Sequence, residues 1–210
     1  MSLQINATYV EGLLLGVGLF SALGPKDSFV IRQSLGGGPV WLVVVVCVLA
    51  DFILIALGVA GVGSLLGRNP AVLSLVLLSG AFYLLWFGVQ RLRASVCDES
   101  MPSAHEMGAS SRGQLLRAAL ILGFANPYAW LDTVVLIGSM GGAKPAGQQA
   151  AFAAGTMTAS LVWFVALAFA SGRLARLFRS RQTWRLLDVA VALLMFYLAS
   201  QIGVDLIQAR

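Results

Sequence analysis

Apolar residues run along this chain in long blocks instead of alternating with polar ones. The stretches 69–90 and 145–172 contain no Asp, Glu, Lys or Arg. Each is longer than the ~20 residues with which an α-helix crosses a bilayer. The remaining blocks, interpreted in the same way, predict six spans in all. These spans lie near 8–34, 39–66, 71–92, 114–140, 147–172 and 184–206.

The composition supports a membrane protein. Hydrophobic residues make up 59% of the 210 residues and charged residues only 11%, whereas soluble domains average about 25% charged residues. An aqueous core could not bury so much apolar surface. The predicted fold class is therefore all-α transmembrane, one helical bundle with the lipid bilayer as its surroundings.

Two of the predicted spans are interrupted by a proline and continue into the same eleven-residue tail. The tails run from Asp27 to Gly37 and from Asp132 to Gly142, and they share the aspartate, a valine, a serine and both glycines. Paired, proline-broken spans at corresponding places in two halves point to the binding site of a secondary transporter. We therefore predict two three-helix repeats, 1–93 and 114–210, whose first helices are broken, joined by a cytoplasmic linker at 94–113.

The basic residues predict the topology. Of the fourteen Lys and Arg residues, ten lie in or beside the loops between spans 1–2, 3–4 and 5–6, and three (Arg68, Lys144, Arg210) lie on the other face. The positive-inside rule places the ten-residue face in the cytoplasm and both termini outside. Three spans per half is an odd number, so the second repeat must be inverted. Topology also explains the basic charge without a nucleic acid, although the Arg173–Arg185 cluster leaves acidic lipid headgroups as the weaker alternative.

Ionisable groups at membrane depth are the candidates for chemistry, because a charge there costs at least ~2.5 kcal/mol and is kept mainly for function. Three acids lie near the middle of spans: Asp27, Asp51 and Asp132. Nearer a span end, Asp188 is three residues from Arg185, so we expect a simple surface pair between them.

The two breaks, at Gly24-Pro25 and Asn126-Pro127, add backbone groups to this set. A proline inside a helix removes one donor and frees a carbonyl a turn earlier, which is tolerated at membrane depth only in a protein interior or beside a watery cavity. The half-helix after each break also turns its N-terminal N–H groups inward. Such a terminus is suited to a carboxylate.

Other chemistry has little support in the sequence. Cys47 and Cys97 do not form a C-x-x-C motif, so we expect neither a disulfide nor redox chemistry. His105 and Glu106 are the only candidate metal pair, and a solvated linker is the stronger interpretation of their segment. Met1–Val10 has no positive charge, so no signal peptide is evident. We expect no cofactor, no metal site and no enzymatic activity.

The motifs themselves resemble those of the LysE family, bacterial inner-membrane exporters of basic amino acids. The segments 23–35 and 126–139 are similar to the two signature motifs of that family, and Ala50-Asp51 and the segment 160–164 match as well. The likeness covers essentially the whole chain and implies the bacterial cytoplasmic membrane. The chain departs from the usual pattern at Lys26 and Asp27, where the family usually has Gln and Asn.

This resemblance leads to a hypothesis for the site. A basic amino acid has one carboxylate and two cationic groups. Asp51 and Asp132 suit the cations, while the helix starts near Pro25 and Pro127, with Asn126, suit the carboxylate. Asp27 is either a third acid or is neutralised by Lys26, and we favour neutralisation. If Lys26 instead faces the substrate, it assists carboxylate binding and favours a zwitterion.

Export of a cation from a negative interior requires an inward counter-ion, for which a proton is the natural choice, with Asp132 alternating between proton and substrate. We expect alternating access by rocking of one repeat against the other. The rival functions are metal cation efflux, export of neutral amino acids and, in a different class, an intramembrane aspartyl enzyme using Asp27 and Asp132. The glycine-rich run 58–63 would allow close helix packing within one chain or in a homo-oligomer.

Overall fold

The computed structural model describes residues 2–21, 23–62, 65, 69–96, 112–174 and 180–208, and within these ranges it contains helices and turns but no strand. The predicted all-α class is confirmed. The helices are α1 (Ser2–Phe20), α2 (Pro25–Leu35), α3 (Val40–Leu57), η1 (Gly58–Val62), α5 (Pro70–Val96), α7 (Arg112–Phe124), α8 (Pro127–Ala129), η2 (Trp130–Ile137), α9 (Gly138–Gly142), α10 (Gln149–Leu174) and α11 (Arg181–Gln208).

Four stretches of helix are long and apolar enough to cross a membrane: Val40–Val62, Pro70–Val96, Gln149–Arg173 and Arg185–Val204. Two further pairs qualify only when their halves are taken together. Gln4–Phe20 and Pro25–Leu35 are bent by 73°, and Arg112–Phe124 and Pro127–Gly142 are bent by 45°. The described part of the chain therefore offers four spans, or six if each bent pair is one span, and the six predicted spans fall on these helices.

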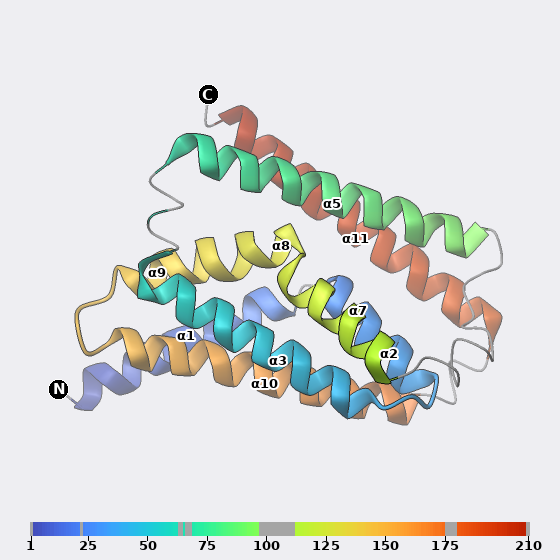
Figure 1. Cartoon of the computed structure of the whole chain (residues 1–210), viewed down its shortest axis with the longest axis horizontal. Helices are drawn as coiled ribbons and strands as arrows, with labels where there is room; N and C mark the ends of the chain where they lie inside the picture. Colours follow the sequence, from blue (N-terminus) through green and yellow to red (C-terminus); the bar gives the residue numbers. More distant parts are fainter. Residues whose placement is uncertain are drawn as a thin grey trace.

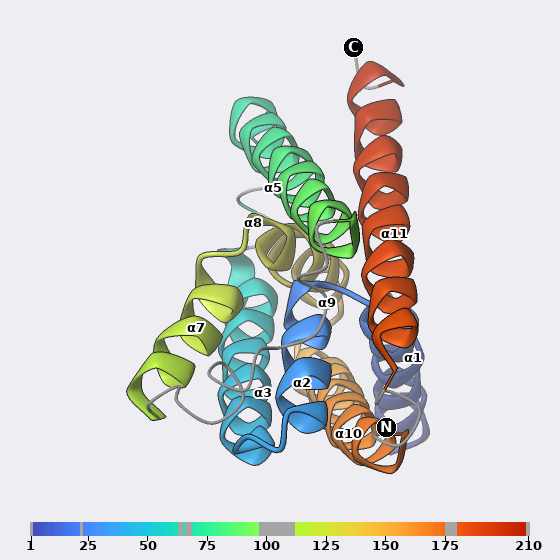
Figure 2. The ribbon, with the colours of Figure 1, turned by 90° about the vertical axis from the view of Figure 1, so that its right-hand side faces the viewer.

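The helices form two layers. The long helices α5 and α11 lie side by side along their lengths, and α1 pairs with α10 in the layer beneath them (Figure 1). In the perpendicular view, α2 lies between α3 and α10, below the α5–α11 pair (Figure 2). The short helices of the second break, α8 and η2, contact α5 and separate the two layers. The helices that follow the two breaks, α2 and α8–η2, thus lie inside the bundle.

Burial distinguishes the helix in the protein interior from those facing the surroundings. Within an apolar 18-residue stretch of each span, 56% of Val40–Val62 (α3 and η1) is buried, compared with 22% of Pro70–Val96 (α5). Cys47, Ala50, Asp51 and Leu54 on α3 are all fully buried. By contrast, Leu75 and Phe82 on α5 project outward, as apolar residues do on a surface that faces lipid. A charge on α3 is therefore enclosed by protein.

Glycines permit the closest helix contact in the interior. A Cβ atom built on Gly138 at the start of α9 would lie 2.5 Å from the Cα of Gly58 in η1, and one on Gly58 would lie 2.9 Å from the Cα of Gly138. No side chain fits at that distance. The predicted packing role of the 58–63 run is thus observed within the chain, for Gly58.

One sequence-based expectation about the surface is wrong. Asp188 on α11 is buried, with 1% of its surface exposed. Arg32 of α2 forms an ion pair with the Asp188 carboxylate, and the Nη1 atom of Arg91 on α5 lies 3.7 Å from the same Oδ1 atom. Asp188 therefore joins three helices from a buried position, so the expectation of a simple surface pair is corrected.

Most of the predicted linker, 94–113, lies outside the described residues. Its first residues belong to the end of α5, which extends to Val96, and its last two begin α7 at Arg112. Cys97, His105 and Glu106 fall in the undescribed part, so the interpretation of these residues stays a prediction.

Candidate functional site

The first break places a polar helix start in the interior. Gly24 is the N-cap of α2, with an extended backbone (φ −103°, ψ −172°), and Pro25 is the first helical residue. A proline is well suited to this position because its missing N–H would have no partner within the helix. The Asp27 carboxylate turns back and accepts a hydrogen bond from the Gly24 N–H at 2.6 Å. The break is therefore a new helix start, and Asp27 helps to fix it.

The second break is built on the same principle with a different cap. Asn126 is the N-cap of α8, and its Oδ1 atom accepts from the Tyr128 N–H at 3.0 Å, while Pro127 occupies the first helical position. Trp130 reaches back across the break and donates its ring N–H to the Phe124 carbonyl at 2.7 Å. The second helix start is thus also stabilised by its own neighbours.

After the second break the backbone adopts a π-helix, η2, from Trp130 to Ile137. π-helical turns are rare, and they occur often at functional sites because the widened turn re-aims side chains. Here η2 carries Asp132 and Thr133, both of which are buried and line a pocket. The sequence gives no local signal for this geometry.

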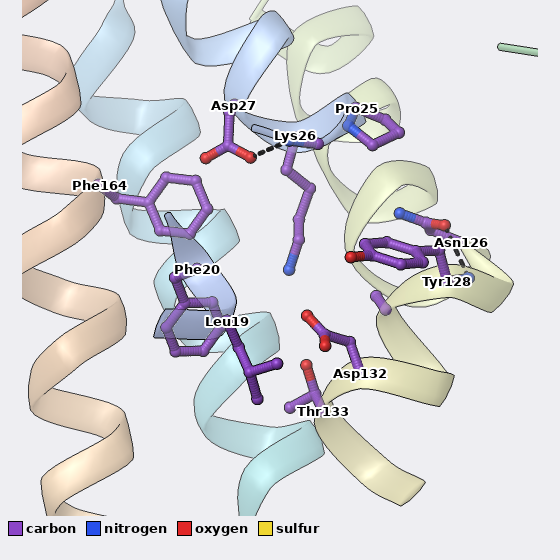
Figure 3. Close-up of a pocket in the computed structure, with 12 residues that line it drawn as sticks. Leu19, Phe20, Pro25, Lys26, Asp27, Asn126, Tyr128, Asp132, Thr133 and Phe164 are labelled. Carbon is purple, nitrogen blue, oxygen red and sulfur yellow. Dashed lines mark hydrogen bonds between the residues drawn. The ribbon is translucent and has the colours of Figure 1, made fainter. Parts of the chain in front are cut away.

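The two breaks face the same pocket. Its lining residues come from α1, α2, α8, η2 and α10 (Figure 3). The lining consists of Leu19, Phe20, Gly24, Pro25, Lys26, Asp27, Asn126, Tyr128, Ala129, Asp132, Thr133 and Phe164. Thus a pocket lined by aromatic rings, two aspartates and a lysine lies where both broken segments meet.

Lys26 extends from the first turn of α2 into this pocket (Figure 3). Its ammonium group forms an ion pair with Oδ1 of Asp51 on α3, and it also lies 5.9 Å from the centre of the Phe164 ring. Oδ2 of Asp51 accepts from the Ser160 hydroxyl of α10 at 2.8 Å. Both oxygens of Asp51 are therefore occupied. The expected neutralisation of Asp27 by Lys26 is corrected by this arrangement, because the ion pair of Lys26 is with Asp51.

Asp27 is held by neutral donors. Besides the Gly24 N–H, its carboxylate accepts from the ring N–H of Trp163 on α10 at 2.8 Å. These two bonds engage both oxygens and fix the side chain at the pocket wall. Asp27 therefore contributes a negative charge in a fixed orientation.

Asp132 has no hydrogen bond or ion pair to any described residue, although it is only 9% exposed. Its carboxylate faces the pocket with Thr133 beside it and Lys26 above it in Figure 3. A buried charge without a partner is costly and is normally matched by a cation or neutralised. Among the three midspan aspartates, Asp132 is thus the one whose carboxylate is available.

The predicted site residues can now be placed. The pocket brings together Gly24, Pro25, Lys26, Asp27, Asn126 and Asp132. Pro127 begins α8 without belonging to the lining, and Asp51 lies behind Lys26, outside the lining and fully buried. Sequence reasoning assigned no role to Ser160, Trp163 or Phe164, although all three lie in the 160–164 segment that resembles the family pattern. The resemblance of this segment to the family pattern was the sequence signal that could have identified these three residues.

The described residues contain no group of three or more His, Cys, Asp or Glu side chains arranged to hold a metal ion. The pocket has instead carboxylates, one ammonium group, an amide and aromatic rings. This set can bind cationic groups at Asp132 and Asp27 and can shield them from the bilayer with aromatic walls.

Comparison with known proteins indicates that the chain is a transporter. The family model described as "LysE type translocator" matches residues 17–206. The arginine exporter proteins ArgO of Salmonella schwarzengrund and of Enterobacter sp. (strain 638) are each 31% identical to the chain over 195 residues, covering 93% of this chain and 92% of theirs. The arginine exporter protein ArgO of Shigella flexneri is 30% identical over 197 residues, covering 94% and 93%. No solved structure gives a significant match.

Proposed function

Because the chain belongs to the LysE type translocator family and is a transporter, not an enzyme, we propose that it exports basic amino acids such as arginine, lysine or close analogues. The relatives described above are arginine exporters that align over more than nine tenths of the chain. We further propose that it works in the bacterial cytoplasmic membrane.

The observation that carries this proposal is the free carboxylate of Asp132. It lines the pocket at the second break, it is 9% exposed, and no described residue pairs with it. A guanidinium or ammonium group of the substrate supplies the missing partner through a charge-assisted hydrogen bond. Asp27, held in place by Gly24 and Trp163, provides a second negative charge for the other cationic group.

The substrate carboxylate needs donors, and the start of α2 has them. The N–H groups in the first turn of a helix have no acceptor within the helix, and the helix dipole favours an anion there. At the second break the Asn126 oxygen already caps Tyr128, which leaves the amide N–H groups of Asn126 as donors. These groups form the carboxylate end of the proposed site.

Energy for export comes from a counter-ion in this proposal. Moving one positive charge outward against an interior-negative potential costs ~2.3 kcal/mol per 100 mV. Entry of a proton in exchange offsets that cost. A carboxylate that must be neutralised when no substrate is bound can take up a proton, and Asp132 meets this condition.

Alternating access between two inverted repeats is supported by the way the helices pair. The first half of the first broken span, α1, packs on α10, and the corresponding first half of the second, α7, packs on α3. The third helices of the two halves, α5 and α11, pack on each other, as do the second helices α3 and α10. Exchanging the two halves leaves these contacts unchanged, as a pseudo-two-fold axis requires.

The deciding experiment is efflux of labelled arginine and lysine from cells that lack their own exporters, with and without this protein and with an imposed proton gradient. Gradient-dependent efflux of either amino acid is expected. Efflux of neither would overturn the proposal, and panels of neutral amino acids and of metal cations would then identify the transported class.

A further inference from the structure

The pocket already contains a cation that belongs to the protein. Lys26 places an ammonium group, at the end of four methylene groups, directly on Asp51. The Lys26 side chain is 12% exposed and Asp51 is fully buried, so the pair is sealed from the surroundings except on the side of the pocket. Chemically, this ammonium group is the same as the side-chain terminus of a lysine substrate.

Asp51 and Asp132 have opposite situations although both are midspan acids. Asp51 is bonded at both oxygens, by Lys26 and by Ser160, whereas Asp132 forms no hydrogen bond or ion pair with a described residue and has only the more distant charge of Lys26 across the pocket. An acid inside a membrane protein needs a neutralising partner: a fixed cation, a proton or a transported cation. Asp51 has the first of these, so of these two acids Asp132 is the one that depends on the other two.

We propose that Lys26 sets the number of protons exchanged, because it takes, as a fixed part of the chain, the place of a mobile cation at Asp51. The proposal rests on the proposed function, since it concerns the number of charges that the exporter exchanges. With Lys26 in place, Asp132 alternates between substrate and proton, whereas Asp51 does not. Without Lys26, Asp51 opens to the pocket as a second acid that needs a mobile cation.

The space in the pocket agrees with this role. The remaining cavity is about 30 Å³, which is room for one or two water molecules and not for an amino acid. Lys26 is the longest flexible side chain in the lining. Substrate entry therefore requires movement of Lys26 or of the helices around it, so Lys26 competes with the substrate for space as well as for a carboxylate.

Other titratable groups near the pair come from several helices. On α2 the neighbour is Asp27, on α3 it is Cys47 one turn before Asp51, and on the second broken segment they are Tyr128 and Asp132. The titratable side chains of α7 and α10 are Arg112 and Arg117 on α7 and Arg173 on α10, and none of them is a carboxyl group. Asp27 and Asp132 are therefore the carboxyl groups that share the pocket with the pair.

The test is the number of protons exchanged per arginine, measured on purified protein in liposomes. Opposing proton and arginine gradients are varied until net arginine flux stops, and the balance point gives the ratio. Lys26→Gln is expected to raise the ratio by about one proton, because Asp51 then requires a proton in each cycle that lacks a substrate cation there. Lys26→Arg, which keeps the charge, is expected to keep the wild-type ratio. A purely structural ion pair would change rates or stability and leave this thermodynamic ratio unchanged.

The double variant Lys26→Gln/Asp51→Asn provides a second way to overturn the role of Lys26, which does not depend on whether Lys26→Gln alone folds. It removes both charges and is expected to transport arginine at the wild-type ratio. An unchanged ratio in a folded Lys26→Gln variant would overturn the role of Lys26, and so would a double variant that is inactive or exchanges one proton fewer. Failure of the wild type to move arginine or lysine would instead overturn the proposed function, which separates the two failures.

Discussion

At the level of single residues, the three midspan aspartates have different surroundings, and this difference assigns their roles. Asp51 is paired with a lysine, Asp27 is bound by two neutral N–H donors, and Asp132 has no partner among the described residues. Position in the membrane alone makes all three candidates. Only the surrounding contacts separate an acid that is occupied from one that is available.

Asp132→Asn tests the role of the available acid. The amide keeps the size of the side chain but can neither balance a cation nor carry a proton, so we expect coupled export of arginine to be abolished. The measurement is arginine efflux against an opposing arginine gradient at a fixed proton gradient. Asn126→Ala is the comparison: because it removes a helix cap, worth about 1 kcal/mol, and the amide donors proposed for the substrate carboxylate, but no acid, we expect reduced stability and a higher KM with coupling retained. Normal export by Asp132→Asn under the opposing gradient would contradict the assignment.

At the level of elements, Asp188 connects α11 to both α2 and α5 through Arg32 and Arg91. The first turn of α2 lines the pocket and its last turn carries Arg32, so this cluster anchors the far end of the helix that positions Lys26 and Asp27. Loss of one partner from a buried ion pair leaves uncompensated charge and costs about 3–5 kcal/mol.

We therefore expect Asp188→Asn to lower the melting temperature of the purified protein in detergent substantially. The matched control is Glu11→Gln, which removes the Glu11–Lys144 pair (2.5 Å) between α1 and the segment before α10. Glu11 is 45% exposed in its side chain, and exposed pairs contribute about 0–1 kcal/mol. Equal melting temperatures for the two variants would show that the Asp188 cluster does not hold the helices together.

The contact between η1 and α9 offers a second test at this scale. In Gly138→Ala the new methyl group would lie 2.5 Å from the Gly58 Cα, so the two helices must separate. Overpacking of this kind typically costs about 1–3 kcal/mol. Gly18→Ala on α1 is the control, because nothing lies within 4 Å of a Cβ there, and alanine favours a helix over glycine by up to about 1 kcal/mol. Thermal unfolding of both variants gives the comparison, and a Gly138→Ala variant as stable as the wild type would refute the close contact.

At the level of the whole molecule, the sequence was sufficient for features determined by local chemistry. Apolar run length predicted the spans, and the prolines predicted the breaks, because both effects act within a few residues. The partners of Lys26 and Asp188 could not be predicted in this way. They lie 25 residues away, at Asp51, and 156 residues away, at Arg32, on other helices, so they depend on how helices pack. The π-helix at Trp130–Ile137 likewise has no local sequence signal.

The orientation of the whole molecule in the membrane can be tested with fusion proteins. Ten of the fourteen Lys and Arg residues belong to one face by the sequence-based topology, and the positive-inside rule places that face in the cytoplasm. An inverted second repeat then brings the C-terminus to the same side as the N-terminus. Alkaline phosphatase fused after residue 210 is expected to be active, because it folds only outside the cytoplasm, whereas a green fluorescent protein at the same point is expected to stay dark.

A fusion within 94–113 must give the opposite pair of results, since this segment follows three spans. Two fusions with the same readout would mean that one half crosses the membrane an even number of times. The second half would then not be an inverted copy of the first, and its bent pair, Arg112–Phe124 with Pro127–Gly142, would enter and leave on the same side. Alternating access by inverted repeats would be excluded, although the pocket between the two breaks and the free carboxylate of Asp132 would remain available to a cation. The pair of fusions therefore tests the architecture separately from the chemistry of the site.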